Sequence, residues 1–175
     1  MSTTVASDRL AGTWSLNPVH SSVEFAVKYL VGSYRARFDE VEAHLADGQL
    51  TGKAKVASVS AKDEMLAGHL QSPDFFDAER YPDLTFDSAS LAVDGDQVTL
   101  EGELTVKGVT RPLTATGTIA GPAQHPAGHT VLGLTLDTTI DRTDFGIEWN
   151  LDLPTGGKAL SNEVELHVVL EFIEA

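Results

Sequence analysis

Cysteine is absent from the 175 residues of this sequence, and so are long apolar runs. Without cysteine the chain forms no disulfide bond and carries out no thiolate chemistry. No stretch approaches the roughly 18 consecutive apolar residues that a transmembrane helix needs. Residues 1–9 contain no basic start followed by an apolar run, so no secretory signal is visible and we expect a cytoplasmic protein.

Basic residues are also scarce: 12 Lys and Arg stand against 26 Asp and Glu, which gives a formal net charge of -14. A field of this sign repels phosphate backbones and anionic membrane surfaces, and it argues against nucleic acid as a partner. The charge also keeps a carrier of apolar cargo soluble. With 42% hydrophobic and 22% charged residues, the composition is that of an ordinary globular domain with one core.

Apolar and polar residues alternate with a period of two through much of the chain, which is typical of half-buried antiparallel strands. The clearest example is segment 97–107, whose apolar positions are Val98, Leu100, Leu104 and Val106. The same pattern predicts strands over residues 23–27, 41–45, 50–56, 84–93, 113–119, 132–140 and 163–172. About eight strands with one apolar face each form either a sandwich or a closed barrel.

Glycine, proline and aspartate mark the turns between these strands. Asp47-Gly48 and Asp94-Gly95-Asp96 predict short hairpins, whereas Gly121-Pro122 and Pro126-Ala127-Gly128 predict a longer loop. The apolar phase of segment 84–93 slips near Ser88-Ala89, which indicates a β-bulge. Successive strands are therefore mostly hairpin neighbours.

One segment departs from the strand pattern. Residues Ser60–Glu64 resemble the capped start of a helix with acidic residues in its first turn, and apolar residues that include Leu66 and Leu70 follow at helical spacing. Pro73 ends this segment. A single short helix in an all-β chain usually plugs or flanks a sheet, so we expect Leu66 and Leu70 to face the apolar interior.

Candidate catalytic and metal-binding groups are few. His20-Ser21 suggests a nucleophile, but the sequence has no Gly-x-Ser-x-Gly elbow, and a cap on the turn before the next strand explains the pair better. His125 and His129 lie in a loop where their spacing fixes no metal geometry. Asp141-Arg142-Thr143-Asp144 forms either an acid–base pair or, as we favour, a structural ion network. We expect no catalytic residue, no metal site and no cofactor.

Several segments resemble the YceI-like family, whose members have a lipocalin-like barrel and bind polyisoprenoids. The segments follow one another in the family's order over roughly residues 12–173. They are Trp14–Val27, His69–Asp77 with Tyr81-Pro82, Gly102–Pro112, Ile140–Ile147 and Leu160–Val164. The resemblance implies an all-β fold, an extended eight-stranded antiparallel lipocalin-like barrel with one short helix near an opening. It implies one barrel domain over residues 12–175 after a flexible N-terminal segment, residues 1–11, and it is compatible with a homodimer.

Apolar residues on the inward side of the predicted strands, the helix and the loop after it would line the space for a lipid chain. The predicted ligand-binding residues are Val23, Phe25, Val27, Phe38, Leu66, Leu70, Phe75, Phe76, Phe86, Leu104, Val106, Leu134, Leu136, Phe145, Ile147 and Trp149. Tyr29 joins them near the barrel mouth, where the family commonly has histidine, and Arg142 and Asp144 are further candidates for contact with a ligand head group. We expect a cavity in the upper part of the ~300–1,000 Å³ range of ligand sites.

Three hypotheses follow. The first, which we favour, is a non-enzymatic carrier of a long-chain apolar small molecule, such as a polyisoprenoid, an isoprenoid quinone or a similar lipid. Burial of such a chain would contribute about 0.8 kcal/mol of binding free energy per methylene, and the protein would select ligands by chain length rather than by chemical identity. The second is a barrel with a filled core that acts in stress protection or assembly through its surface. The third is an enzyme for a hydrophobic substrate.

Overall fold

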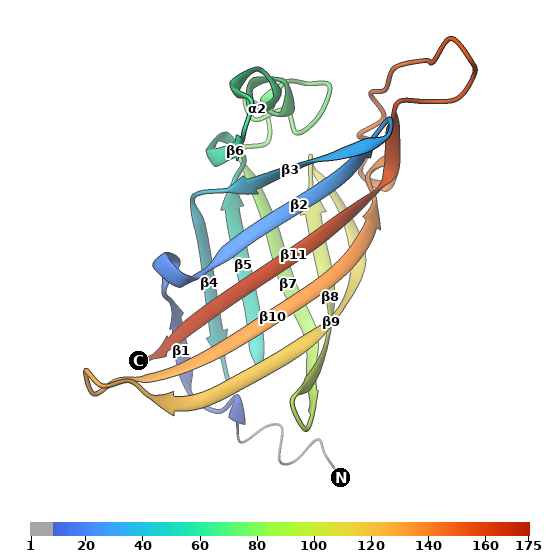
Figure 1. Ribbon diagram of the computed structural model, residues 1–175. Coiled ribbons are helices and arrows are strands. Elements are labelled where there is room, and N and C mark those ends of the chain that lie inside the picture. The colour runs from blue at the N-terminus through green and yellow to red at the C-terminus, as the bar shows by residue number, and fades with distance from the viewer. Residues whose placement is uncertain (1–8) are drawn as a thin grey trace.

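The computed structural model describes residues 9–175 and shows a barrel of antiparallel strands with one helix at its upper end (Figure 1). The strands are β1 Thr13–Leu16, β2 Ser22–Tyr29, β3 Gly32–Phe38, β4 Val41–Ala46, β5 Gln49–Lys55, β6 Val59–Ala61, β7 Asp83–Asp94, β8 Gln97–Val106, β9 Val109–Gln124, β10 Thr130–Asp141 and β11 Leu160–Glu174. The helix is α2 Glu64–Gln71, and the 3-10 turns are η1 Pro18–His20, η2 Val56–Ser58 and η3 Arg142–Phe145.

The strands close into a ring of antiparallel pairs. Their order around the ring is β1-β4-β5-β7-β8-β9-β10-β11, and β11 pairs again with β1. In this closing pair Leu16 lies opposite Phe172, and Trp14 lies opposite Glu174. Closure pairs the backbone of both outer strands, so the ring has no long open edge.

Three of the barrel strands are bent, and each bend divides one strand into two labelled segments. η1 separates β1 from β2, Asp39-Glu40 separates β3 from β4, and η2 separates β5 from β6. Both halves of a bent strand keep the same neighbour, because β1 pairs with β4 where β2 pairs with β3, and β4 pairs with β5 where β3 pairs with β6. The predicted eight-stranded antiparallel barrel is confirmed.

Most predicted turns are confirmed, and one is wrong. Asp47-Gly48 joins β4 to β5, Asp94–Asp96 joins β7 to β8, and the register of β7 on β8 shifts at the expected bulge near Ser88. The longer loop predicted over residues 121–128 is wrong in its extent, because β9 runs on to Gln124 and the loop occupies only residues 125–129. Pro122 is tolerated in β9 because the pairing of β9 with β10 is irregular at this point, so its missing N–H leaves no regular ladder bond unmade.

Helix α2 begins later than its sequence pattern predicts, because Ser60 and Ala61 belong to β6. Asp63 caps the helix, since its carboxylate accepts a hydrogen bond from the N–H of Met65 at 2.9 Å. The helix ends ahead of Pro73, as predicted. Among residues 9–175, no helix is both long enough and apolar enough to span a membrane.

The apolar interior consists of two clusters at different heights in the barrel. The lower cluster contains side chains with almost no exposure, among them Trp14 at 1%, Leu45 at 0% and Phe172 at 0%. Leu70 of α2 belongs to the upper cluster, and the partly buried Leu66 packs against that cluster. The lower end of the barrel is therefore closed by its own side chains, and the helix covers the other end.

The predicted flexible segment, residues 1–11, falls for the most part outside the described residues. Arg9 donates hydrogen bonds to the carbonyl of Gly121 at 2.7 Å and to that of Gly95 at 2.7 Å. Leu10 is 2% exposed in the lower cluster. From Arg9 onward the chain is packed against the barrel.

Two glycines provide a test of how tightly the barrel is built. A Cβ atom on Gly117 of β9 would lie 1.7 Å from the carbonyl oxygen of Thr135, whereas one on Gly68 of α2 would meet nothing within 4 Å. We expect Gly117→Ala to lower the free energy of unfolding by at least about 2 kcal/mol, because backbone must move. We expect Gly68→Ala to raise it by about 0.5–1 kcal/mol. Urea unfolding measures both, and equal effects of the two substitutions would contradict this account.

Candidate functional site

A cavity of about 190 Å³ lies inside the barrel, between the filled lower end and helix α2. All eight barrel strands contribute to its wall, and α2, the chain after α2 and the region of η3 close it from above. The wall is almost entirely apolar. The apolar character of the wall follows from the period of two along each strand, because every second side chain points into the ring and these positions are apolar.

Most of the predicted ligand-binding residues lie in this wall. They are Val23, Phe25, Val27, Phe38, Leu70, Phe75, Phe76, Phe86, Leu104, Val106, Leu136, Phe145 and Ile147. Residues far apart in the sequence thus meet around one space.

The other predicted residues lie outside the wall. Tyr29 is 38% exposed beside the β2–β3 hairpin, and Leu134 is buried in the lower cluster. Leu66 is on α2 but packs against the upper cluster without reaching the cavity, and Trp149 packs on the ring of His69 with centroids 4.6 Å apart.

Some wall residues are absent from the predicted set. Val164, Leu166, Val168 and Leu170 of β11 line the cavity, and so does Tyr34 of β3. The alternation over residues 163–172 predicts that these β11 side chains share one face, but it carries no information on their height along the barrel. Tyr34 carries a similar signal, because Tyr34, Ala36 and Phe38 alternate with Arg35 and Arg37, although the predicted strands do not include this segment.

Three phenylalanine rings narrow the upper part of the cavity. The ring centroids of Phe25 and Phe38 are 5.7 Å apart, and Phe76 lies 5.8 Å from Phe25 and 5.6 Å from Phe38 in edge-on contacts. Contacts of this geometry add to the stabilisation from burial. Phe76 comes from the chain after α2, so this three-ring cluster ties the cover to the barrel wall.

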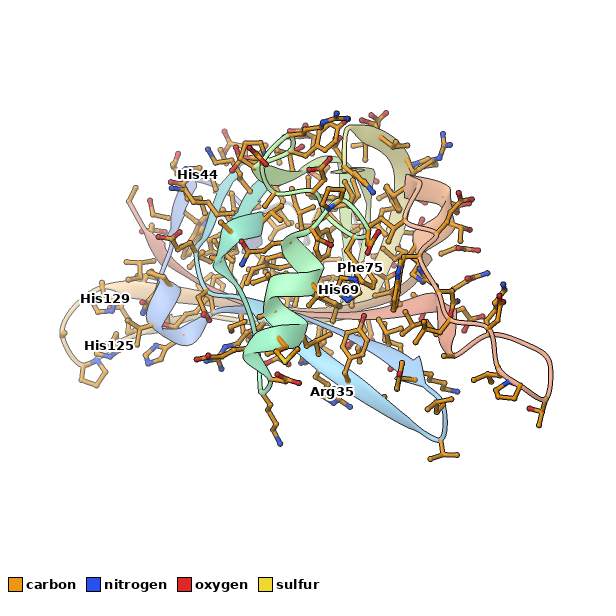
Figure 2. The ribbon with its side chains drawn as sticks, turned by 90° about the horizontal axis from the view of Figure 1, so that it is seen from above. Arg35, His44, His69, Phe75, His125 and His129 are labelled. Atoms are coloured by element: carbon orange, nitrogen blue, oxygen red, sulfur yellow. The ribbon has the colours of Figure 1, made fainter. Side chains whose placement is uncertain are left out.

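A second aromatic group fixes the helix end over the opening. Figure 2 shows His69 and Phe75 close together beside α2, and their ring centroids are 4.9 Å apart. Trp149 contacts both rings, and His69 Nε2 lies 2.9 Å from Asp74 Oδ2. The cover is therefore held by side chains from α2, from the chain after it and from the segment before β11.

The cavity is smaller than the sequence analysis expects. Its volume of about 190 Å³ lies below the ~300–1,000 Å³ range of typical ligand sites. The lower cluster fills one end of the barrel, and the three-ring cluster occupies part of the other. An apolar cavity of ~150 Å³ binds benzene, so the present space accommodates roughly one or two five-carbon units.

Arg142 is the one charged residue with a buried side chain in the upper wall, and it is 4% exposed. Its Nε donates to the carbonyl of Ser161 at 2.9 Å, and its Nη1 donates to those of Ile147 at 3.0 Å and Trp149 at 2.8 Å. The predicted ion network around Arg142 is wrong, because Asp141 accepts hydrogen bonds from Thr143 instead. Asp144 also forms no ion pair with it among residues 9–175.

Arg142 and Tyr34 influence each other electrostatically. Burial raises the pKa of the Tyr34 phenol to about 12, and the cation of Arg142 opposes that shift. Burial likewise lowers the pKa of Arg142, while Tyr34 and Asp141 act in the opposite direction. The hydrogen bonds from Thr143 hold the pKa of Asp141 below its usual value. At neutral pH the wall therefore presents a guanidinium and a neutral phenol.

The other polar candidates lie away from the cavity. Ser21 Oγ donates to the carbonyl of Asn17 at 2.7 Å and accepts from the N–H of Glu171 at 3.0 Å, so the pair His20-Ser21 caps the bend at η1, as the sequence suggests. The rings of His125 and His129 stack with centroids 4.3 Å apart in a peripheral loop (Figure 2). Within residues 9–175, no three side chains of His, Cys, Asp or Glu gather as metal ligands would.

Comparisons with known proteins agree with this architecture. The chain is 32% identical over 168 residues to the UPF0312 protein SA2479 of Staphylococcus aureus (strain N315), which covers 91% of this chain and 96% of that protein. The crystal structure of Burkholderia cenocepacia BcnA matches with a TM-score of 0.76 at 22% identity, over 89% of this chain and 98% of BcnA.

A polyisoprenoid binding domain from Saccharophagus degradans, implicated in plant cell wall breakdown, matches with a TM-score of 0.73 at 17% identity, over 93% of this chain and 98% of that domain. At such low identity these two structures establish the fold alone. The profile of the YceI-like domain matches residues 14–172, nearly the whole described chain. The protein therefore belongs to the YceI-like domain family.

Proposed function

We propose that this protein is a non-enzymatic carrier that holds the chain of a polyisoprenoid, an isoprenoid quinone or a similar lipid inside its barrel. The observation that carries the proposal is the apolar cavity of about 190 Å³. Protein interiors are close-packed, and voids much larger than a water molecule are few. At ~24 cal/mol per Å³, an empty space of this size costs roughly 4 to 5 kcal/mol of stability. A ligand that fills it recovers much of that free energy.

Burial of the ligand supplies the binding free energy. One five-carbon unit contributes roughly 3 to 4 kcal/mol at about 0.8 kcal/mol per buried carbon, before the loss of ligand freedom is subtracted. Apolar walls distinguish ligand length better than ligand identity. The relative from Saccharophagus degradans is described as a polyisoprenoid binding domain, which supports the same class of ligand for this chain.

The wall favours binding over catalysis. Its polar side chains near the upper end, Tyr34 and Arg142, form no pair of nucleophile and base, and the candidate pair His20-Ser21 lies at η1, outside the wall. A ligand longer than the present space requires a ring of the three-ring cluster to move. We expect this ring to be Phe76, because it comes from the chain after α2 rather than from a barrel strand.

We expect the protein to take up one short isoprenoid alcohol per chain. Geraniol, with two five-carbon units, is the matched probe for the present cavity, and native mass spectrometry gives its stoichiometry. Ala115→Leu places a larger side chain in the wall and lowers uptake, whereas Ala120→Leu on the exposed face of the same strand leaves uptake unchanged.

If geraniol, farnesol and longer polyprenols all fail to bind and no lipid is extracted from the purified protein, the carrier proposal is wrong. A filled barrel that acts through its surface would then be the better hypothesis.

Ligand length is expected to depend on Phe76. Phe76→Ala removes one ring of the cluster, so the affinity for farnesol relative to that for geraniol rises at least about tenfold, because a further five-carbon unit becomes buried. Met65→Ala, at a position 83% exposed on α2, is the control and leaves the ratio unchanged. Calorimetric titration measures both affinities, and an unchanged ratio in Phe76→Ala would show that this ring does not limit ligand length.

A further inference from the structure

The guanidinium of Arg142 is held in the cavity wall with one nitrogen to spare. Its Nε and Nη1 donate to three backbone carbonyls, those of Ser161, Ile147 and Trp149. Its Nη2 is fully buried and has no hydrogen-bond partner among residues 9–175. A buried donor without a partner costs free energy, more so when the group is charged. Because the three carbonyls fix the plane of the guanidinium, the spare nitrogen cannot simply rotate away.

The positive charge of Arg142 also lacks a direct partner. No carboxylate of residues 9–175 lies within ion-pairing distance of the guanidinium. The carboxylate of its neighbour Asp141 accepts hydrogen bonds from the N–H and the hydroxyl of Thr143, at 2.9 and 2.6 Å. Carbonyl dipoles satisfy N–H groups but do not neutralise a net charge. A buried cation of this kind is stabilised most by an anion brought to its free side.

Tyr34 supplies a second donor in the same wall. Its side chain lines the cavity from β3, and the pKa of its phenol is shifted by burial and by the charge of Arg142 rather than by a hydrogen bond. With a pKa raised to about 12, the phenol stays protonated at neutral pH and donates its proton. Arg142 and Tyr34 line the same cavity and act on each other electrostatically, so a carboxylate, which has two oxygens, is the anion that suits two such donors. A phosphate or diphosphate would bring more oxygens and more charge than they can satisfy.

We propose that Arg142 Nη2 and the Tyr34 hydroxyl form an anion subsite in the cavity wall, and that the preferred ligand is an aliphatic chain ending in a carboxylate. This inference rests on the proposed function, because the rest of the cavity must accept the chain. It narrows the ligand class to amphipathic monocarboxylic acids. The protein as a whole carries a charge of -14, so preference for an anion has to come from this local site.

The experiment compares three ligands with the same eight-carbon chain: octanoate, octanamide and 1-octanol. Calorimetric titration at pH 7 and about 0.15 M salt, where long-range repulsion is screened, is expected to show octanoate binding at least about tenfold more tightly than either neutral ligand. Tyr34→Phe removes only the hydroxyl and weakens octanoate several-fold while leaving 1-octanol unchanged. Tyr29→Phe removes an equivalent hydroxyl outside the wall and changes neither affinity.

Arg142→Lys keeps a cation but loses the planar fork, and it is expected to reduce the preference for octanoate. Because Arg142 also holds three backbone carbonyls, this variant is interpreted only if its unfolding curve is near that of the unaltered protein. A second readout does not need a variant. The carbonyl resonance of bound [1-¹³C]octanoate, followed against pH, should show a pKa of the bound acid below that of the free acid, because the cation stabilises the carboxylate.

Each outcome has a distinct meaning. Equal affinities of the three ligands, or a pKa of the bound acid raised by burial alone, would overturn the anion subsite and leave the apolar carrier intact. Tighter binding of octanamide than of octanoate would also overturn it, since the wall would then favour a neutral acceptor. If none of the three ligands binds and geraniol also fails, the proposed function itself is wrong.

Discussion

Closure of the barrel rests on β1, a strand of four residues that pairs with β4 on one side and with β11 on the other. β11 is much longer and pairs with β2 beyond the end of β1, so one strand serves both halves of the bent strand. The bend at η1 lies between these two pairings, and Ser21 fastens it to the backbone of Glu171. Because the ring is closed, each strand residue is committed to the inside or the outside, and the interior is decided by the sizes of the inward side chains.

The distribution of side-chain size along the barrel axis places the cavity. Large residues such as Trp14 and Phe172 close the lower end. Small residues also line the cavity, namely Ala43, Gly52, Ala54 and Ala115, and two of them, Ala43 and Ala115, belong to the lower cluster. Higher up, the chain after α2 adds Phe75 and Phe76 to the wall. These small side chains leave space that their larger neighbours do not fill, and such a space is exceptional because protein interiors are packed to a density of about 0.75.

The sequence predicts those features that local periodicity encodes. Alternation identifies β8 and β11, and Asp-Gly pairs identify two hairpins, because these signals depend on neighbours in the chain. β3 carries the same signal, since Tyr34, Ala36 and Phe38 alternate with Arg35 and Arg37, although it is missing from the predicted strands. β6 carries none, because its place depends on the bend at η2. Alternation also fails to separate Leu134, buried in the lower cluster, from Leu136, which lines the cavity two residues later on the same face. Height along the barrel is set by strand register around the ring, and no local pattern records it.

Arg142 shows why the same limit applies to charged residues. The local sequence Asp-Arg-Thr-Asp suggests ion pairs, but Thr143 takes the oxygens of Asp141, and the carbonyl of Asp144 accepts from Arg111 at 3.1 Å. The guanidinium instead binds the carbonyls of Ile147 and Trp149, in the irregular chain between η3 and β11, and that of Ser161 near the start of β11, where the pairing with β2 is irregular. That role accounts for Nε and Nη1, and it leaves the net charge and Nη2 without a function inside the protein. Arg142 lines the cavity and is fixed by three carbonyls, and its remaining donor has no partner among residues 9–175, so the group is organised to meet a ligand.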